Sequence, residues 1–113
     1  MRLFVYGSLK RGEANHGVLG GARFLGVTRT ASAFALSEIE TFPALVPGDR
    51  AIVGELFEFP RARLPELDSF EGSAYVRCEI SLESGAVATS YVARDASAGV
   101  PLAVSEWAAP IHR

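Results

Sequence analysis

The sequence predicts one small, soluble α+β domain that spans residues 1–113. Turn-forming residues recur about every ten positions, which is typical of a strand-rich domain. Apolar and polar side chains alternate strictly over residues 75–82, which predicts a strand with one buried face. Apolar residues at helical spacing over 63–71 predict a short helix. A chain of this length can bury a core without cross-links, and no linker or repeat marks a domain boundary.

The chain opens with a buried strand and a sharp turn. Residues 3–6 are a continuous apolar run that ends at Gly7, a pattern typical of a strand buried on both faces. The segment 42–48 is extended and bounded by prolines, which predicts an edge strand because proline cannot donate to a β-ladder. Further strands are expected at 24–28, 33–36, 52–59 and 87–93.

Two short helices and one hairpin turn complete the expected elements. Asn15 is predicted to cap a brief helix at 16–19 that Gly20 stops. The helix at 63–71 is the second. A Ser-Gly pair at 84–85 predicts the turn that joins the strand at 75–82 to its return strand. The tail from residue 101, which includes the only tryptophan, carries no pattern that assigns it.

Composition narrows the classes of function. A single cysteine, Cys78, excludes an intramolecular disulfide, and no metal-ligand spacing is present. The N-terminal apolar run is too short for a signal peptide or a membrane span, so we expect a cytoplasmic protein. A net charge of −2 with interspersed signs disfavours nucleic acid and a membrane surface as partners. A small ligand remains open, while His16 and His112 are expected to face solvent and Cys78 to lie in the core.

A carboxylate interrupts the apolar side of the helix predicted at 63–71. Leu64, Leu67 and Phe70 define that side. At 100° per residue Glu71 falls at about 340° from Leu64, between the two leucines. Burial of a free carboxylate is costly and raises its pKa. Such an environment is one in which proteins hold a glutamate ready to exchange protons near neutral pH, so Glu71 is a candidate catalytic residue.

Other interpretations of Glu71 stay open at this point. It could simply pair with an arginine at the helix end, such as Arg77. Asp68 borders the same helix face at about 40°, so a carboxylate pair is conceivable, although an aspartate in such a place more often supports a loop. Gly72 follows at once, which suits a helix stop and lets the chain pass close to the carboxyl group.

The turn after the first strand is a second candidate feature. At residues 6–9 the buried strand runs into a glycine turn, where successive backbone N–H groups can point at one anion or polarised carbonyl. An ordinary strand exit would look the same. A phosphate loop is disfavoured because Glu13 follows Gly12 where lysine is required, and no G-x-S-x-G motif encloses Ser8.

Several short motifs occur in a fixed order along the chain. They are Phe4-Val5-Tyr6-Gly7-Ser8-Leu9 with Gly12 after it, Phe42-Pro43-Ala44, Val53-Gly54-Glu55-Leu56-Phe57, and Leu67-Asp68-Ser69-Phe70-Glu71-Gly72 with Tyr75 and Arg77. In this order they resemble the γ-glutamylcyclotransferase-like family, in its compact bacterial and γ-glutamylamine (AIG2-like) branches, as far as about residue 91. The resemblance implies an α+β fold with a small, mixed, β-barrel-like sheet and one or two short helices.

The resemblance also implies an activity. Family members split a γ-glutamyl amide by attack of its own α-amine on the side-chain carbonyl, which releases 5-oxoproline and a free amine or peptide. In this sequence the proton shuttle would be Glu71, and the substrate-binding residues would be Tyr6, Gly7, Ser8, Leu9, Tyr75 and Tyr91. The partner would be a small γ-glutamyl substrate, and neither a metal nor a cofactor is required.

Some details depart from the family pattern and leave the substrate open. Phe42 stands where many relatives carry tyrosine, and the link at 72–75 lacks the proline often seen in the γ-glutamylamine branch. Arg77 could bind a substrate carboxylate or form a surface ion pair. Two alternative functions stay open: a non-catalytic module that binds a small metabolite in the same cavity, and removal of a γ-glutamyl protecting group in a biosynthetic pathway.

Overall fold

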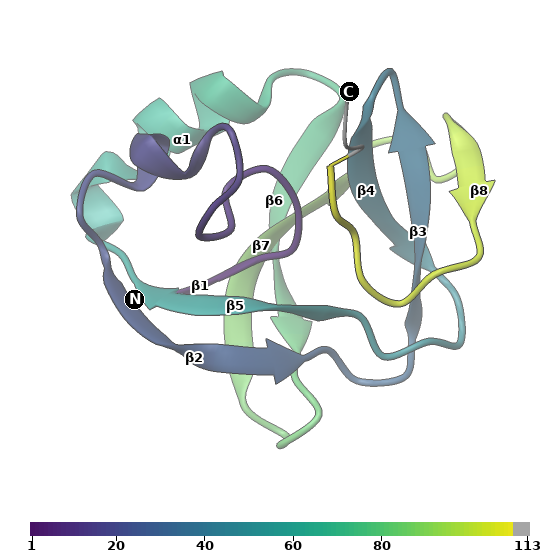
Figure 1. Ribbon diagram of the computed structural model, residues 1–113, viewed down its shortest axis with the longest axis horizontal. Helices are drawn as coiled ribbons and strands as arrows, with labels where there is room; N and C mark the ends of the chain where they lie inside the picture. The colour runs from purple at the N-terminus through teal and green to yellow at the C-terminus, as the bar shows by residue number, and fades with distance from the viewer. Residues whose placement is uncertain (110–113) are drawn as a thin grey trace.

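The computed structural model describes residues 1–109. Within them eight strands form one mixed, strongly curled sheet, with a single α-helix lying across one end (Figure 1). The strands are β1 (Arg2–Val5), β2 (Arg23–Arg29), β3 (Phe34–Ile39), β4 (Phe42–Pro47), β5 (Val53–Glu58), β6 (Tyr75–Ser81), β7 (Val87–Ala93) and β8 (Val100–Leu102). The helices are α1 (Leu64–Glu71) and the 3-10 turns η1 (His16–Leu19) and η2 (Arg61–Arg63).

β1 lies in the interior of the sheet. The order is β2-β5-β1-β7-β4-β3-β8, with β6 paired to β7 as a branch. β1 runs antiparallel to β5 and parallel to β7, so the N-terminal strand has neighbours on both edges. The predicted α+β class with a barrel-like mixed sheet is confirmed.

The apolar run in β1 is explained by two core clusters on opposite faces of the sheet. Leu3 and Val5 pack with Leu64 and Leu67 of α1, together with residues of β5 and β7. The alternate residues Phe4 and Tyr6 pack with side chains of β3, β4 and β7 and with Trp107. Because side chains alternate across a strand, a strand covered on both faces must be apolar throughout.

The predicted hairpin of β6 and β7 is confirmed, but one end of β6 is less buried than the alternation predicts. Seven residue pairs join the strands, from Tyr75 with Ala93 to Ser81 with Val87. Ile80 is buried as the alternation predicts, but Val76 is 38% exposed. Among the described residues β6 pairs only with β7, so the first residues of β6 lie at an edge of the sheet.

The proline-bounded segment lies inside the sheet, so its prediction as an edge strand was wrong. β4 runs between β3 and β7. Its ladder to β7 comprises one pair, Leu45 with Val92, and the Leu45 N–H donates instead to the hydroxyl of Tyr6 at 3.0 Å. The ladder on this side is sparse, so the donors that Pro43 and Pro47 lack are not needed there.

Two predictions about the helices need correction. Phe70 is 41% exposed, because it stands at the margin of the apolar stripe in the last turn of α1, whereas Leu64 and Leu67 are buried as expected. The predicted turn at 16–19 forms and Gly20 ends it, but Asn15 makes no side-chain cap. The Asn15 side chain donates to Ser8 Oγ at 3.0 Å instead.

The C-terminal segment, which sequence patterns left unassigned, joins the core. β8 pairs with β3, and the Val53 N–H donates to the Ser105 carbonyl at 2.8 Å. Trp107 is 8% exposed and belongs to the second core cluster. His112 lies outside the described residues. No helix in residues 1–109 is long and apolar enough to cross a membrane.

Candidate active site

A cavity of about 390 Å³ opens where the end of β1, the tip of the β3–β4 hairpin and the end of α1 meet. Its volume suits a small molecule. The cavity is lined by every residue that the sequence predicted for the site, namely Tyr6, Gly7, Ser8, Leu9, Glu71, Tyr75 and Tyr91. The fold therefore brings the glycine turn and the helix-end carboxylate to one space, although 62 or more residues separate them in the sequence.

Glu71 is the last residue of α1 and is half-buried in the cavity wall. Burial away from water raises the pKa of its carboxyl from 4.5 to about 7. The expected alternative, an ion pair with Arg77, does not form: Arg77 pairs with Asp68 at 3.4 Å. Within the described residues no basic group pairs with Glu71. A small change of pH near neutrality therefore shifts the carboxyl group between its neutral and its charged form.

The glycine turn is built around a close approach of its backbone to the ring of Pro43. A Cβ on Gly7 would lie 2.8 Å from Cγ of Pro43 in β4, a distance that real side chains do not tolerate, so only glycine fits. The Gly7 carbonyl accepts from the Lys10 N–H at 3.1 Å, which closes the turn. Within residues 1–109 the N–H groups of Gly7, Ser8 and Leu9 donate to no protein acceptor. Three consecutive residues of the cavity lining thus carry N–H groups without a protein acceptor, as in backbone segments that bind anions.

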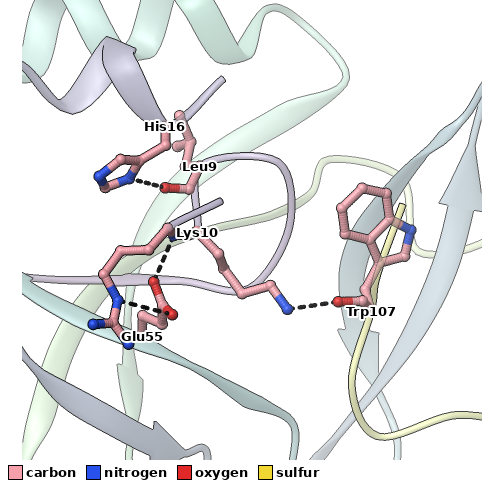
Figure 2. Close-up of polar contacts among 6 residues, drawn as sticks. Leu9, Lys10, His16, Glu55 and Trp107 are labelled. Carbon is pink, nitrogen blue, oxygen red and sulfur yellow. Dashed lines mark hydrogen bonds and ion pairs between the residues drawn. The ribbon is translucent and has the colours of Figure 1, made fainter. Parts of the chain in front are cut away.

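The loop that carries this turn is fastened at several points, three of which Figure 2 shows. His16 Nδ1 lies 2.9 Å from the Leu9 carbonyl, which fixes that nitrogen as the donor. Glu55 of β5 accepts from the backbone N–H of Arg11 at 2.7 Å. Lys10 Nζ donates to the Trp107 carbonyl at 2.5 Å (Figure 2). A turn held from three directions is preorganised, which lowers the cost of binding.

Each of the three tyrosines has its hydroxyl bound to protein. Tyr6 donates to the Tyr91 carbonyl at 2.7 Å and accepts from the Leu45 N–H, so it ties β1, β7 and β4 together. Tyr75 donates to the Pro43 carbonyl at 2.9 Å. Tyr91 donates to Asp68 at 2.5 Å. Burial raises the pKa of all three phenols, to about 12 for Tyr75. Each tyrosine therefore lines the cavity as an uncharged side chain.

Sequence comparison identifies the family. Residues 3–109 match the profile described as gamma-glutamyl cyclotransferase, AIG2-like. The chain belongs to this family. A gamma-glutamylcyclotransferase family protein of Escherichia coli is 34% identical over 79 residues, which covers 68% of this chain and 69% of the relative. A putative gamma-glutamylcyclotransferase of Vibrio cholerae is 36% identical over 69 residues, covering 61% of this chain.

Some of these AIG2-like relatives are longer than the region that matches. The match spans 60% of the Vibrio cholerae protein and 62% of a rat gamma-glutamylaminecyclotransferase, which is 32% identical over 100 residues and covers 71% of this chain. Solved structures agree with the fold. A mouse AIG2-like protein superposes with a TM-score of 0.71 at 32% identity, over 82% of this chain and 76% of its own. An uncharacterised Pyrococcus horikoshii protein gives 0.76 at 27%, covering 90% and 85%.

The family motifs now have physical roles that the sequence did not reveal. Glu55, in the Val-Gly-Glu motif, fastens the loop that carries the glycine turn, and Asn15 binds Ser8 within that turn. Asp68 supports Tyr91 and Arg77 rather than forming a carboxylate pair with Glu71. Glu55 and Arg11, like Asp68 and Tyr91, come from segments far apart in the sequence, so no spacing could have indicated these contacts.

Proposed function

We propose that this AIG2-like chain is a cyclotransferase that cleaves a γ-glutamyl amide and releases 5-oxoproline. The observation that carries the proposal is the placement of Glu71, a carboxyl group with a pKa of about 7, in the same cavity as three unused N–H donors. Family membership supports the general reaction. The relative named for gamma-glutamylamine cleavage supports an amide of a γ-glutamyl group as the substrate.

The proposed step is an intramolecular acyl transfer. The α-amine of the glutamyl group attacks its own side-chain carbonyl carbon, a new C–N bond closes the five-membered ring, and the bond to the leaving nitrogen breaks. The attacking nitrogen gives a proton to Glu71, and Glu71 returns one to the leaving amine. No water is consumed. General acid–base catalysis of this kind contributes roughly 10²- to 10⁴-fold.

The turn supplies the second part of the proposed mechanism. Among the described residues, the cavity wall contains no lysine, arginine or histidine. The N–H groups of Gly7, Ser8 and Leu9 are therefore the donors on offer for the two anionic groups of the reaction, the substrate carboxylate and the developing oxyanion. Because the turn is already fastened, it can hold the glutamyl chain folded for ring closure, which lowers the barrier by several kcal/mol.

The proposal is tested with a panel of γ-glutamyl amines and peptides, with 5-oxoproline measured by mass spectrometry. Wild type should form 5-oxoproline from at least one compound, and Glu71→Gln, which keeps the shape, should lower kcat by at least about 100-fold. The wild-type kcat/KM should rise with pH through about 7, because Glu71 must be ionised to accept the proton. The variant should lack this rise.

Glu83→Gln removes the same charge from the exposed β6–β7 turn and serves as the matched control. It should leave turnover unchanged. Full turnover by Glu71→Gln would refute the proton shuttle. Binding of γ-glutamyl compounds by wild type without any 5-oxoproline would instead support a module that binds and does not turn over. Turnover confined to a γ-glutamyl group on a large biosynthetic intermediate would identify a deprotecting enzyme.

A further inference from the structure

The outer rim of the cavity has an unusual charge. Besides the neutral tyrosines, the ionisable side chains among the described lining residues are two carboxylates, Glu71 at the end of α1 and Glu40 at the tip of the β3–β4 hairpin. Glu40 forms no ion pair with any described base. The substrate cavity therefore carries negative charge that the protein does not neutralise.

Glu40 is held in a conformation that glutamate does not prefer. Ile39 and Phe42 are directly paired, so Glu40 and Thr41 form a two-residue hairpin loop. Glu40 has a φ of 57°, and within residues 1–109 it is the one residue other than glycine with a positive φ. Hairpins of this length usually place glycine at a first loop position with positive φ. Residues held in such a conformation cluster at functional sites, which directs attention to the Glu40 carboxylate.

The charge of the Glu40 carboxylate acts on Tyr75, a residue that lines the cavity. Tyr75, whose hydroxyl binds Pro43 just beyond the hairpin, has its pKa raised to about 12 by burial, then by the charges of Glu71 and Glu40. The charges of Glu71 and Glu40 therefore both act on this one phenol, and all three residues line the cavity.

Two exposed apolar rings line the same cavity as the two carboxylates. Phe42 at the start of β4 is 42% exposed, and Phe70 in the last turn of α1 is 41% exposed, and both line the cavity. Exposed phenylalanines offer a surface on which methylene groups can pack. A ligand in this cavity can therefore meet both apolar rings and the Glu40 carboxylate.

Resting on the proposed function, we propose that Glu40 determines specificity for the leaving group: the enzyme favours γ-glutamyl amides of aliphatic amines with a cationic far end. The methylene stem packs on Phe42 and Phe70, and the terminal ammonium lies near Glu40. An amino acid or peptide leaving group that ends in a carboxylate meets two negative charges, and no described basic side chain of the cavity compensates them.

The test uses three γ-glutamyl n-alkylamides of equal length that end in an ammonium, a methyl or a carboxylate group. Wild type should show a kcat/KM for the ammonium compound at least about tenfold above that for the carboxylate compound, and this ratio should shrink at high salt. Glu40→Gln should cut the ratio about fivefold and change the methyl compound less than about twofold. The control Glu83→Gln should leave the ratio unchanged.

Binding separates this inference from the proposed reaction. Dissociation constants of the same three amides, measured by calorimetry on Glu71→Gln and on the double variant with Glu40→Gln, need no turnover. The same order of affinity, lost with Glu40, supports the charge selection even if 5-oxoproline never forms. Equal affinities, no binding at all, or a wild-type ratio that Glu40→Gln leaves intact would overturn it, while turnover without a charge preference would leave the cyclotransferase standing.

Discussion

Glu71 should make the protein less stable as the pH rises, and this can be measured without a substrate. Its pKa is about 7 in the folded chain and close to 4.5 when the chain unfolds. Between these values the folded state binds more protons, so the stability contribution is complete below about pH 4.5 and is lost as the pH passes 7. The shift corresponds to at most about 3 kcal/mol, and residual access to water reduces it to about 2 kcal/mol.

The perturbation is Glu71→Gln, which removes the ionisation and keeps the shape. At each pH the free energy of unfolding of wild type is subtracted from that of the variant. This difference should be about 2 kcal/mol larger at about pH 8 than at about pH 5. Urea unfolding followed by the fluorescence of Trp107, the single buried tryptophan, reports both values. Comparing the difference at two pH values cancels the cost of burying the glutamine amide.

Glu83→Gln again serves as the control, since Glu83 is exposed in the β6–β7 turn, and Figure 1 shows that turn at the far end of the sheet from α1. Its difference from wild type should be the same at both pH values. An equal difference for Glu71→Gln at both pH values would refute the argument, because it would mean that water solvates the carboxylate in the folded protein. Greater stability of Glu71→Gln at high pH would show that the proposed site is maintained at a cost to stability.

Two further predictions concern the supports of the site. Lys10→Met keeps the aliphatic stem and removes the donor to the Trp107 carbonyl, so we expect about 1 kcal/mol less stability and a lower kcat/KM as the turn loosens; unchanged urea midpoints and rates would contradict this. Tyr91→Phe removes the hydrogen bond to Asp68 and should lower the free energy of unfolding by about 1 to 2 kcal/mol, with Arg77→Gln as a comparison because that ion pair is exposed and should matter less. An equal loss for both variants would show that the Tyr91 bond is no stronger than a surface pair.

Local patterns predicted most elements because local physics decides them. The continuous apolar run before Gly7 indicated a strand buried on both faces, and the alternation at 75–82 indicated a strand paired in a hairpin. Predictions failed where a distant segment decides. β4 was expected at an edge, yet Tyr6 accepts its Leu45 N–H and so allows prolines in the interior. Phe70 was expected in the core, yet α1 ends at the cavity.

The sequence alone therefore determined that Glu71 would be a carboxylate on an apolar helix face and that Gly7 would begin a turn. Both follow from periodicity and backbone sterics within a few residues. Only the tertiary structure decided that Arg77 pairs with Asp68 and leaves Glu71 unpaired, and that Glu40 stands at the mouth of the same cavity. Ion pairing and burial depend on which segments meet across the sheet, and spacing along the chain does not specify that meeting.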